Sequence, residues 1–430
     1  MLNYFFPKEF YMTKYNAFYA QSGGVTAVIN ASAAGVIEAF RASQQLGQLY
    51  AGLNGIAGAL NENLVDTQIL STSELKLLKQ TPGGIFGSCR IKLKSIQDNK
   101  TQFERILSVF KAHNIKYFFY NGGGDSQDTA AKMANYCENF GYDLVCIGIP
   151  KTIDNDLPLT DNSPGFGSVA KYIATSILEA SLDLKSMCDS STKVFILEVM
   201  GRHAGWIAAS SGLSQDVMPN LPLLILLPEL ALDEQKLCQA VLKKIQKYGY
   251  CSIVVSEGLK NQTGQFLSQS HYKDAFGHAQ LGGVAPIIAH LIKRKLQLKC
   301  HWSVADYLQR SAGHLSAQVD LTQAYALGQA AVNFALTGHR SVMPIIKRLK
   351  DEPYEWSIGQ VALGKVANVE VKMPEHFISE DGLHITEACK IYLRPLIQGE
   401  VALQFKKGLP QYLIKQFQSI EKKLPDYVPD

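Results

Sequence analysis

Short apolar runs alternate with helix-like stretches along most of the chain, and this alternation limits the possible folds more than any other feature. The apolar runs show no strict alternation with polar residues, and they lie at residues 15–20, 115–120, 143–149, 193–199, 222–227 and 251–257. Strands of this kind are typical of parallel sheets that helices cover on both faces. We therefore predict an α/β fold with two doubly wound, mostly parallel, Rossmann-like sheets.

The length of 430 residues exceeds what one hydrophobic core usually supports, so we expect two domains. The first is predicted to comprise residues 15–163 together with about 308–345. The second is predicted to comprise residues 164–307 and to begin with a long amphipathic helix at 164–184.

The two ends of the chain are expected to lie outside these domains. Residues 1–14 are predicted to form a leader, and residues 346–430 an extension that packs on the core. Within the extension, residues 360–373 have a strand-like pattern and residues 409–424 a helical one. No chemistry is apparent there, so we expect a structural or oligomer-forming role.

The composition excludes several classes of protein. A net charge of +4 fits an enzyme with anionic substrates but is too weak to indicate nucleic-acid binding. No apolar stretch approaches the roughly 20 residues of a membrane-spanning helix, so no membrane partner is expected. The eight cysteines are scattered without C-x-x-C or zinc spacing, which favours the reducing cytoplasm.

Glycine-rich segments follow two of the predicted strands and occur once more between them. They are "QSGGVTAVIN" at 21–30, "YNGGGDSQDTA" at 120–130, and "PGGIFGSCR" at 82–90, which ends in Arg90. Backbone amides before a helix, or an arginine beside a flexible loop, can bind phosphate oxygens. The alternatives are a tight turn and a surface arginine. Asp125, inside the second segment, is an unexpected charge for a phosphate loop.

The segment "PKTIDND" at 150–156 is more specific. Lys151, Asp154 and Asp156 come directly after a strand, where ligands collect in open α/β sheets. Two acids at this spacing can supply a base and its orienting group or bind a metal, and the lysine can neutralise phosphate charge. A polar turn with a helix-capping aspartate is the alternative, but the position at a strand end favours function.

Three further motifs complete the set. Arg202 in "EVMGRHAGW" offers another phosphate contact, and Glu257 in "SEG" is suited to accept hydrogen bonds from sugar hydroxyls. Tyr307 and Arg310 in "DYLQRSAGH" share one face if this segment is helical. Each motif is weak alone. Together they supply the groups needed to move a phosphoryl group onto a sugar phosphate.

The order of the motifs resembles the phosphofructokinase family, and specifically its pyrophosphate-dependent branch. The resemblance runs from about residue 15 to about 340 through "SGGVTAVINA", "GGIFGSCR", "GGGDSQDTA", "PKTIDND", "KVFILEVMGRHAGW", "SEG" and "YLQRSA", and "YKDAFGHAQLGG" at 272–283 is also similar. It implies reversible phosphoryl transfer from pyrophosphate to the 1-hydroxyl of fructose 6-phosphate, a step of glycolysis and gluconeogenesis. It also implies a donor site in the first domain and a sugar-phosphate site in the second.

The resemblance also implies a role for each matching position. Asp154 is the expected general base, and Lys151, Asp125 and Arg202 are expected to take part in catalysis. Lys193 is expected to reach a neighbouring subunit's site in a homodimer or higher homo-oligomer. Donor binding is implied for Gly24, Arg90, Gly123, Gly124 and Ser126, and sugar-phosphate binding for Thr152, Ile153, Asp156, Met200, Gly201, Glu257, Tyr307 and Arg310.

Two positions bear on the choice of donor. ATP-dependent relatives carry glycine where this chain has Asp125 and Lys151. The resemblance implies that the carboxylate of Asp125 occupies the space of an ATP α-phosphate. Two like charges ~4 Å apart at an effective dielectric near ~20 repel by ~4 kcal/mol, which is on the order of a thousandfold in affinity.

Two departures from the family pattern keep alternatives open. Gly124 stands where relatives usually have Asp or Asn associated with Mg²⁺, so the expected Mg²⁺ would be held by Asp125, by backbone and water, or by Asp154 and Asp156. Cys300 and His301 stand near the place of an arginine that reaches the sugar phosphate of an adjoining subunit. The alternatives are an ATP-dependent 6-phosphofructokinase, or a pyrophosphate-dependent kinase for another ketose phosphate such as sedoheptulose 7-phosphate.

Overall fold

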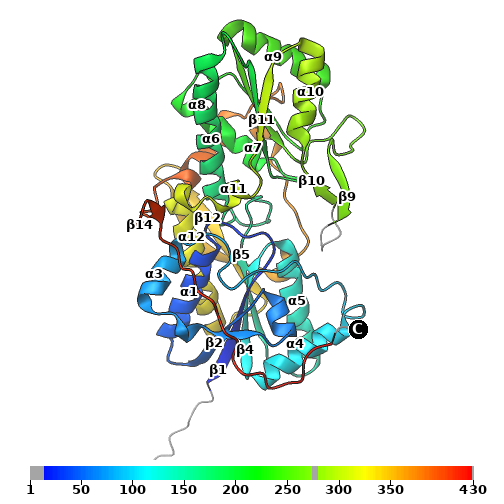
Figure 1. Ribbon diagram of the computed structural model, residues 1–430. Helices are drawn as coiled ribbons and strands as arrows, with labels where there is room; N and C mark the ends of the chain where they lie inside the picture. Colours follow the sequence, from blue (N-terminus) through cyan, green and yellow to red (C-terminus); the bar gives the residue numbers. More distant parts are fainter. Residues whose placement is uncertain (1–13, 274–278, 429–430) are drawn as a thin grey trace, which may run out of the picture.

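The computed structural model describes residues 14–273 and 279–428, and it contains two α/β lobes (Figure 1). The lobes are built on a seven-stranded and a four-stranded sheet. Residues 1–13 of the predicted leader and residues 274–278 of the segment at 272–283 lie outside the described residues. None of the described helices combines the length and the apolarity that a bilayer span requires.

The seven-stranded sheet has the strand order β13-β12-β5-β4-β1-β2-β3. Its five inner strands are parallel, and the edge strands β3 and β13 pair antiparallel with their neighbours. The strands are β1 (Tyr15–Gln21), β2 (Leu46–Gly52), β3 (Leu64–Asp66), β4 (Ile115–Gly122), β5 (Val145–Pro150), β12 (Val342–Lys350) and β13 (Glu355–Ala362).

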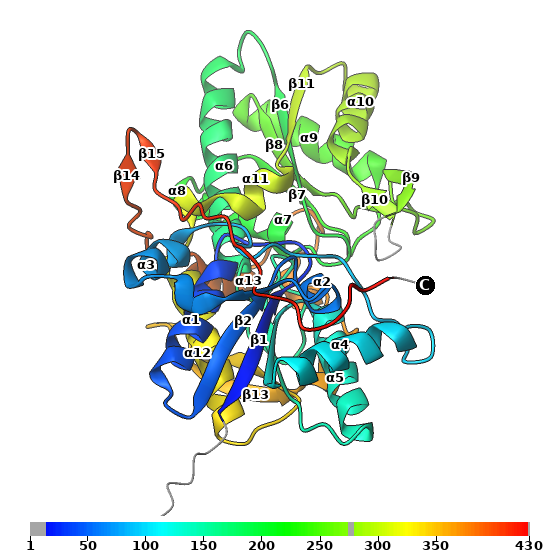
Figure 2. The same ribbon diagram turned by 60° about the horizontal axis from the view of Figure 1, so that its bottom comes forward.

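Helices cover both faces of this sheet (Figures 1 and 2). One core lies under α2, α4 and α5, and the other under α1, α3 and α12. β1 alternates between them, with Phe18 in the first core and Tyr19 in the second. The bounds are α1 (Ile29–Ala42), α2 (Ile56–Leu60), α3 (Thr72–Gln80), α4 (Lys100–Ala112), α5 (Gly124–Asn139) and α12 (Gln318–Leu336).

The four-stranded sheet is parallel throughout, with the order β11-β6-β8-β7. Its cores lie under α6, α7 and α13 on one face and under α9 and α10 on the other. The bounds are β6 (Val194–Val199), β7 (Leu223–Leu226), β8 (Cys251–Ser256), β11 (Cys300–Val304), α6 (Phe166–Met187), α7 (Trp206–Ser210), α8 (Ser214–Val217), α9 (Glu234–Tyr248), α10 (Val284–Leu296), α11 (Asp306–Ser311) and α13 (Glu387–Leu393).

Short elements complete the chain. Two small antiparallel pairs are formed by β9 (Gln269–Lys273) with β10 (Ala279–Leu281) and by β14 (Phe405–Lys406) with β15 (Leu409–Pro410). The 3₁₀ helices are η1 (Thr67–Ile69), η2 (Ser211–Leu213), η3 (Gly313–Leu315), η4 (Leu363–Lys365), η5 (Glu375–Phe377) and η6 (Arg394–Ile397).

The six strands predicted from apolar runs are confirmed as β1, β4, β5, β6, β7 and β8, and the long helix predicted at 164–184 is α6. The two sheets, one mostly and one wholly parallel, confirm the predicted α/β class. β1 and β4 are adjacent, whereas the chain runs from β1 to β2 on the other side. Such a switch in strand order is where open α/β sheets bind ligands. Two predicted glycine-rich segments follow β1 and β4.

The helix predicted at 409–424 is wrong, because beyond β15 this segment has no helix. It lies extended over the first lobe (Figure 2). The Leu413 amide donates to Thr81 Oγ1, and the Ile420 amide donates to the Leu64 carbonyl. The ring of Phe417 packs on that of Phe86. The apolar residues of this segment have helical spacing, but each contacts a different part of the first lobe. An extended chain spans about 3.3 Å per residue, against 1.5 Å in a helix, so it can reach all of them.

The strand-like pattern at 360–373 is only partly confirmed. β13 ends at Ala362, η4 follows, and residues 366–373 form no strand. Val366 is buried in a core of the first lobe and Met373 in a core of the second. We call residues 366–373 the strap. Its apolar residues serve as anchors at its two ends and do not form one face of a sheet.

A buried carboxylate joins the two lobes at the start of α6. Asp320 of α12 accepts hydrogen bonds from the Gly165 amide (2.9 Å), the Ser168 amide (2.9 Å) and Ser168 Oγ (2.6 Å). Its side chain therefore satisfies N–H groups that the first turn of α6 leaves without a partner.

We predict that Asp320→Asn lowers the free energy of unfolding by about 2–3 kcal/mol, because an amide NH₂ group would face N–H donors in a buried site. Urea unfolding of the full chain measures the change. Asp183→Asn, on the exposed face of the same helix, is the control and should change stability by less than about 0.5 kcal/mol. Equal effects of the two substitutions would contradict the capping role.

Candidate active site

A cleft of about 760 Å³ is lined by residues that follow strands of both sheets. It brings together thirteen of the residues selected from the sequence, although they span almost three hundred positions. They are Gly24, Arg90, Asp125, Lys151, Thr152, Ile153, Asp154, Asp156, Met200, Arg202, Glu257, Tyr307 and Arg310. The strand-end motifs therefore share one site.

The double glycine after β1 lies beneath three cationic side chains. A Cβ atom at Gly24 would lie 2.9 Å from Arg310 Nη1 and 3.7 Å from Arg90 Nη2, and a Cβ atom at Gly23 would lie 3.4 Å from Lys151 Nζ. Gly23 also has a φ of +73°, which L side chains rarely adopt. The absence of side chains thus leaves room for a small anion between the backbone and the three cations.

Lys151 is buried, with 5% of its surface exposed, and Nζ donates to the Gly24 carbonyl at 2.7 Å. This bond connects the loop after β5 to the loop after β1. Burial lowers the pKa of Lys151 to about 8, although the nearby carboxylates of Asp154 and Asp156 act in the opposite direction. The lysine is therefore still mostly protonated at neutral pH but close to its titration point.

The acidic loop, residues 152–156, follows Lys151. Burial raises the pKa of Asp154, and Lys151 opposes the shift. Burial raises the pKa of Asp156 to about 7, and the charge of Asp154 adds to it. Asn155 between them has a φ of +55°, so the chain reverses there. Both carboxylates therefore bind a proton more tightly than a free aspartate does, a property that suits a proton acceptor.

The other wall of the cleft comes from loops after β6 and β8 that pack backbone to backbone. A Cβ atom at Gly258 would lie 2.0 Å from the Arg202 carbonyl oxygen, so only glycine fits. Burial raises the pKa of neighbouring Glu257 to about 7, Asp154 adds to the shift, and Arg202 lowers it. Arg202 and Glu257 therefore face the acidic loop from the second lobe.

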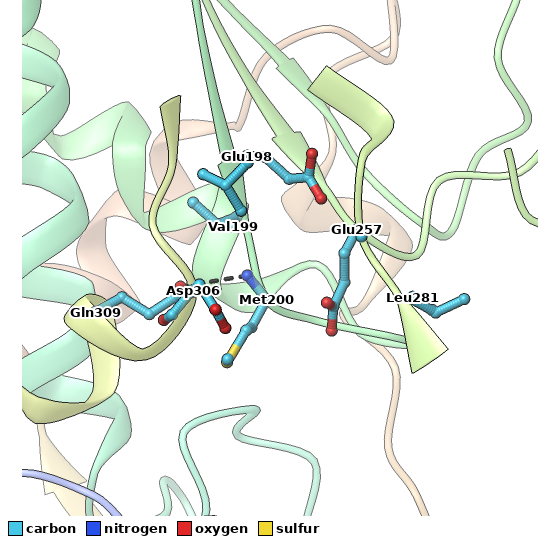
Figure 3. A pocket seen from close by; sticks show the side chains of 9 residues that line it. Glu198, Val199, Met200, Glu257, Leu281, Asp306 and Gln309 are labelled. Atoms are coloured by element: carbon cyan, nitrogen blue, oxygen red, sulfur yellow. Dashed lines mark hydrogen bonds between the residues drawn. The ribbon is translucent and has the colours of Figure 1, made fainter. Parts of the chain in front are cut away.

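A second pocket of about 340 Å³ shares Met200, Glu257, Leu281 and Asp306 with the cleft and reaches the end of β6 (Figure 3). Gln309 of α11 accepts a hydrogen bond from the Met200 amide at 3.2 Å. Glu198 accepts the amides of Gly283 and Ala285, both at 2.8 Å, and so caps α10. Polar groups at the mouth of this pocket can orient a hydroxylated ligand that enters from the cleft.

Asp125 is not an isolated charge. Its carboxylate forms an ion pair of 2.5 Å with Lys92, and both side chains are about one-third exposed. The repulsion of an ATP α-phosphate expected from the sequence assumed that this carboxylate is unpaired. Lys92 partly neutralises its charge and so weakens that repulsion. Asp125 nevertheless lines the cleft in the first turn of α5, so its side chain still occupies space there.

Some predicted residues do not line the cleft. Gly123, Gly124 and Ser126 lie at the start of α5, next to Asp125 in the sequence. Gly201 precedes Arg202 and has a φ of +126°. Lys193 lies away from the cleft, and its Nζ donates to the Cys188 carbonyl. Arg310, which the resemblance links to the sugar phosphate, lies beside Gly24 and Arg90.

Sequence reasoning missed the residues that the strap contributes. Glu370, Val371 and Lys372 line the cleft, and Glu370 Oε2 lies 2.6 Å from His203 Nδ1. The sequence offered no signal for them, because the strap follows no strand end. Lys260 and Asp306 were also missed, although each is within three residues of a selected motif residue.

The side chains that could act as metal ligands determine which metal the cleft could hold. The described residues contain no group of three His, Cys, Asp or Glu side chains arranged around a metal position. The cleft nevertheless offers the carboxylates of Asp125, Asp154 and Asp156. Mg²⁺ commonly uses one or two carboxylates, with water and substrate phosphates as its other ligands. The arrangement therefore fits Mg²⁺ held jointly with a bound phosphate ligand.

The comparisons with known proteins agree with this geometry. Residues 16–335 match the phosphofructokinase family. A protein of Halomonas elongata named pyrophosphate–fructose 6-phosphate 1-phosphotransferase is 56% identical over 97% of this chain and 100% of its own length. Crystal structures of pyrophosphate-dependent phosphofructokinases are also similar. The one from Nitrosospira multiformis has a TM-score of 0.89 at 54% identity, covering 96% of this chain and 99% of that one. The one from Marinobacter aquaeolei has 0.88 at 52%, covering 96% and 100%.

We predict that anion binding weakens as the pH rises through about 8, because Lys151 loses its proton there. Sulfate is the probe, since its charge is constant over this range, and calorimetry or thermal shift measures its affinity. Lys151→Met should bind sulfate about tenfold more weakly near neutral pH, and its affinity for sulfate should show no step near pH 8. Lys94→Met, at an exposed lysine, should keep it. A step that persists in Lys151→Met would assign the titration to another group.

Proposed function

The chain belongs to the phosphofructokinase family, and from that premise we propose that it transfers a phosphoryl group from pyrophosphate to the 1-hydroxyl of fructose 6-phosphate. The observation that carries the proposal is the buried Lys151 ammonium, which lies between the Gly24 carbonyl and the acidic loop. A buried cation beside a proton acceptor is suited to hold a phosphoryl group next to a hydroxyl that must lose its proton.

In the proposed reaction, Asp154 accepts the proton of the 1-hydroxyl. The hydroxyl oxygen bonds to one phosphorus of pyrophosphate while the bond from that phosphorus to the bridging oxygen breaks. The products are fructose 1,6-bisphosphate and phosphate, and the reverse path returns the proton from Asp154. A raised pKa suits this role, because a base works best when its proton affinity is near the working pH.

We assign the cationic side chains of the cleft to two different phosphoryl groups. Arg90, Lys151 and Arg310 surround Gly24 and are assigned to the phosphoryl donor. Arg202 lies between the acidic loop and Glu257, so we assign it to the phosphoryl group in transit. Charge on the transferring group is spread over its outer oxygens, and positioned cations lower the barrier by stabilising it.

Mg²⁺ is the expected cofactor. Asp125, Asp154 and Asp156 are the side chains that would hold it together with the donor phosphates. When bound, the ion neutralises negative charge on pyrophosphate. The chain's own contribution is the set of carboxylates at the junction of the two lobes, where Lys151 limits their repulsion.

The sugar phosphate is assigned to the second lobe. We assign to it Thr152, Ile153 and Asp156 of the acidic loop, together with Met200 and Gly201 of the loop after β6. Glu257 would accept hydrogen bonds from the sugar hydroxyls. Tyr307 would contact the 6-phosphate, and its ring lies 3.8 Å from the Arg310 guanidinium. In β11, Cys300 is half-buried and His301 exposed, so another ketose phosphate such as sedoheptulose 7-phosphate remains the second candidate acceptor.

Two properties of the whole protein follow from the same proposal. We expect a homodimer or larger homo-oligomer in which Lys193 reaches a neighbouring subunit's sugar-phosphate site. We also expect a cytoplasmic enzyme, consistent with all eight cysteines being free thiols in the structure.

Removing the proposed base should reduce turnover strongly. We predict that Asp154→Asn lowers kcat by about 10²–10⁴, the usual contribution of a general base, while the KM for fructose 6-phosphate changes little. Steady-state kinetics with pyrophosphate measures both constants, and Asp154→Ala should behave similarly. Full activity in either variant would show that another group accepts the proton.

The donor preference has a separate test. Asp125→Gly combined with Lys151→Gly should lower kcat/KM for pyrophosphate, by about tenfold or more because a buried charged contact is lost. A panel of pyrophosphate, ATP and polyphosphate against several ketose phosphates measures donor and acceptor choice together. If the unmodified protein uses ATP as well as pyrophosphate, the donor assignment is wrong.

A further inference from the structure

The acidic loop touches a part of the chain for which the sequence indicated no chemistry. Asn155 Nδ2 donates a hydrogen bond of 2.8 Å to the hydroxyl of Tyr392, in α13 of the C-terminal extension. Asn155 lies between the proposed base and Asp156, and its φ of +55° makes the turn that presents both carboxylates. Its amide oxygen accepts the Ser163 amide at 2.9 Å, so both ends of this side chain are held.

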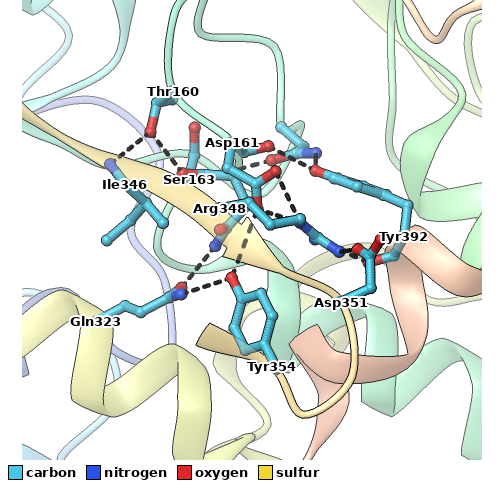
Figure 4. Close-up of polar contacts among 11 residues, drawn as sticks. Thr160, Asp161, Ser163, Gln323, Ile346, Arg348, Asp351, Tyr354 and Tyr392 are labelled. Atoms are coloured by element: carbon cyan, nitrogen blue, oxygen red, sulfur yellow. Dashed lines mark hydrogen bonds and ion pairs between the residues drawn. The ribbon is translucent and has the colours of Figure 1, made fainter. Parts of the chain in front are cut away.

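Tyr392 is itself held in place on several sides (Figure 4). The Tyr392 hydroxyl donates to the Asp161 carbonyl at 2.7 Å, and Arg348 Nη2 donates to the backbone carbonyl of Tyr392 at 3.0 Å. Its ring centroid lies 5.1 Å from that of Trp206 in the "MGRHAGW" motif. The side chain therefore touches both the acidic loop and the helix that follows the Arg202 loop.

The strap holds the same loop from another direction. The Val371 amide donates to the Asp156 carbonyl at 2.8 Å, and the Met373 amide donates to Glu229 Oε1 at 3.1 Å. Glu229 Oε1 also accepts the Gly205 amide at 2.8 Å. Two separate segments of the extension thus contact residues 155 and 156, one through a side chain and one through the backbone.

We propose that Tyr392 is a positioning residue, which fixes the acidic loop through Asn155 so that Asp154 faces the substrate hydroxyl. The proposal rests on the proposed function of Asp154. It assigns the C-terminal extension to the catalytic apparatus, with the Val371 bond as a second restraint on the loop. Displacement of a reacting group by ~1 Å can cost about a hundredfold in rate, so even a modest loosening of this turn is measurable.

The matched pair Tyr392→Phe and Tyr354→Phe tests the proposal. Tyr354 belongs to the same network, where its hydroxyl contacts Gln323 (3.0 Å) and Asp161 (3.5 Å) and its ring lies near Arg348 (Figure 4). Each substitution removes one hydroxyl from one network. Tyr392→Phe should lower kcat about tenfold with KM values within about twofold, and Tyr354→Phe should change kcat by less than about twofold. Equal kinetic effects, or a change in KM alone, would overturn the proposal.

A double-mutant cycle identifies the path of the effect. Asn155→Gly keeps the positive φ and removes the amide. If Tyr392 acts through Asn155, Asn155→Gly with Tyr392→Phe should be about as active as Asn155→Gly alone. The effect of Tyr354→Phe should instead multiply with that of Asn155→Gly. Multiplicative losses for the Tyr392 pair would show that the hydroxyl does not act through Asn155.

Val371 gives a second test that leaves the tyrosines unchanged. Val371→Pro removes the N–H group that binds the Asp156 carbonyl, and Val371→Ala keeps it. We expect a larger loss of kcat in the proline variant. Similar values for the two would remove the strap from the proposal.

Hydrogen exchange separates this proposal from the proposed function. The peptide covering residues 150–165 should exchange about tenfold faster in Tyr392→Phe than in Tyr354→Phe. This readout needs no catalysis. A protein that transfers no phosphoryl group from pyrophosphate would refute the proposed function, whereas equal exchange in the two variants would refute the positioning role.

Discussion

The burial of the Lys151 ammonium is the interaction on which the rest of the cleft depends. Removing a charge from water is unfavourable unless polar partners replace the water. Here the Gly24 carbonyl and the carboxylates of Asp154 and Asp156 replace it. The loop after β5 must therefore lie against the loop after β1, and glycines there leave space for Arg90 and Arg310. One lysine thus links the phosphate-type site to the proposed base.

The second constraint is that charged loops must be held without filling the cleft. The two lobes meet around these loops, and much of the restraint comes from behind. Asp320 caps α6 from the first lobe, Tyr392 holds Asn155, and the strap joins cores of both lobes. Asp320 and Tyr392 do not line the cleft, whereas the strap does so through Glu370, Val371 and Lys372. The extension, expected from its sequence to have a structural or oligomer-forming role, therefore contacts the acidic loop and lines part of the cleft.

Much of the fold and site was predictable, for a physical reason. Strands buried on both faces are almost continuously apolar, so the run at 115–120 marked β4 without any knowledge of its neighbours. Parallel strands place their carboxyl ends at one edge, so motifs after them had to meet. The errors share a cause too. The conformations of residues 409–424 and of the strap are set by the surfaces that they cover. Nothing in their own pattern reveals this, because the spacing of Leu413 and Phe417 is also compatible with a helix. The Lys92–Asp125 pair was missed because the loop that carries Lys92 has no regular pattern.

The sequence by itself determined the two mostly parallel sheets, the strand-end positions of the site, and the residue types available there, because these depend on local pattern and on the polarity of neighbouring residues. Only the tertiary structure decided which groups share charge and which hold others in place. Lys92 reduces the charge of Asp125, Arg310 lies beside Gly24 and Arg90, and Tyr392 reaches Asn155 across 237 positions of the chain. Such contacts arise from packing between distant segments, and packing leaves no periodic trace in the sequence.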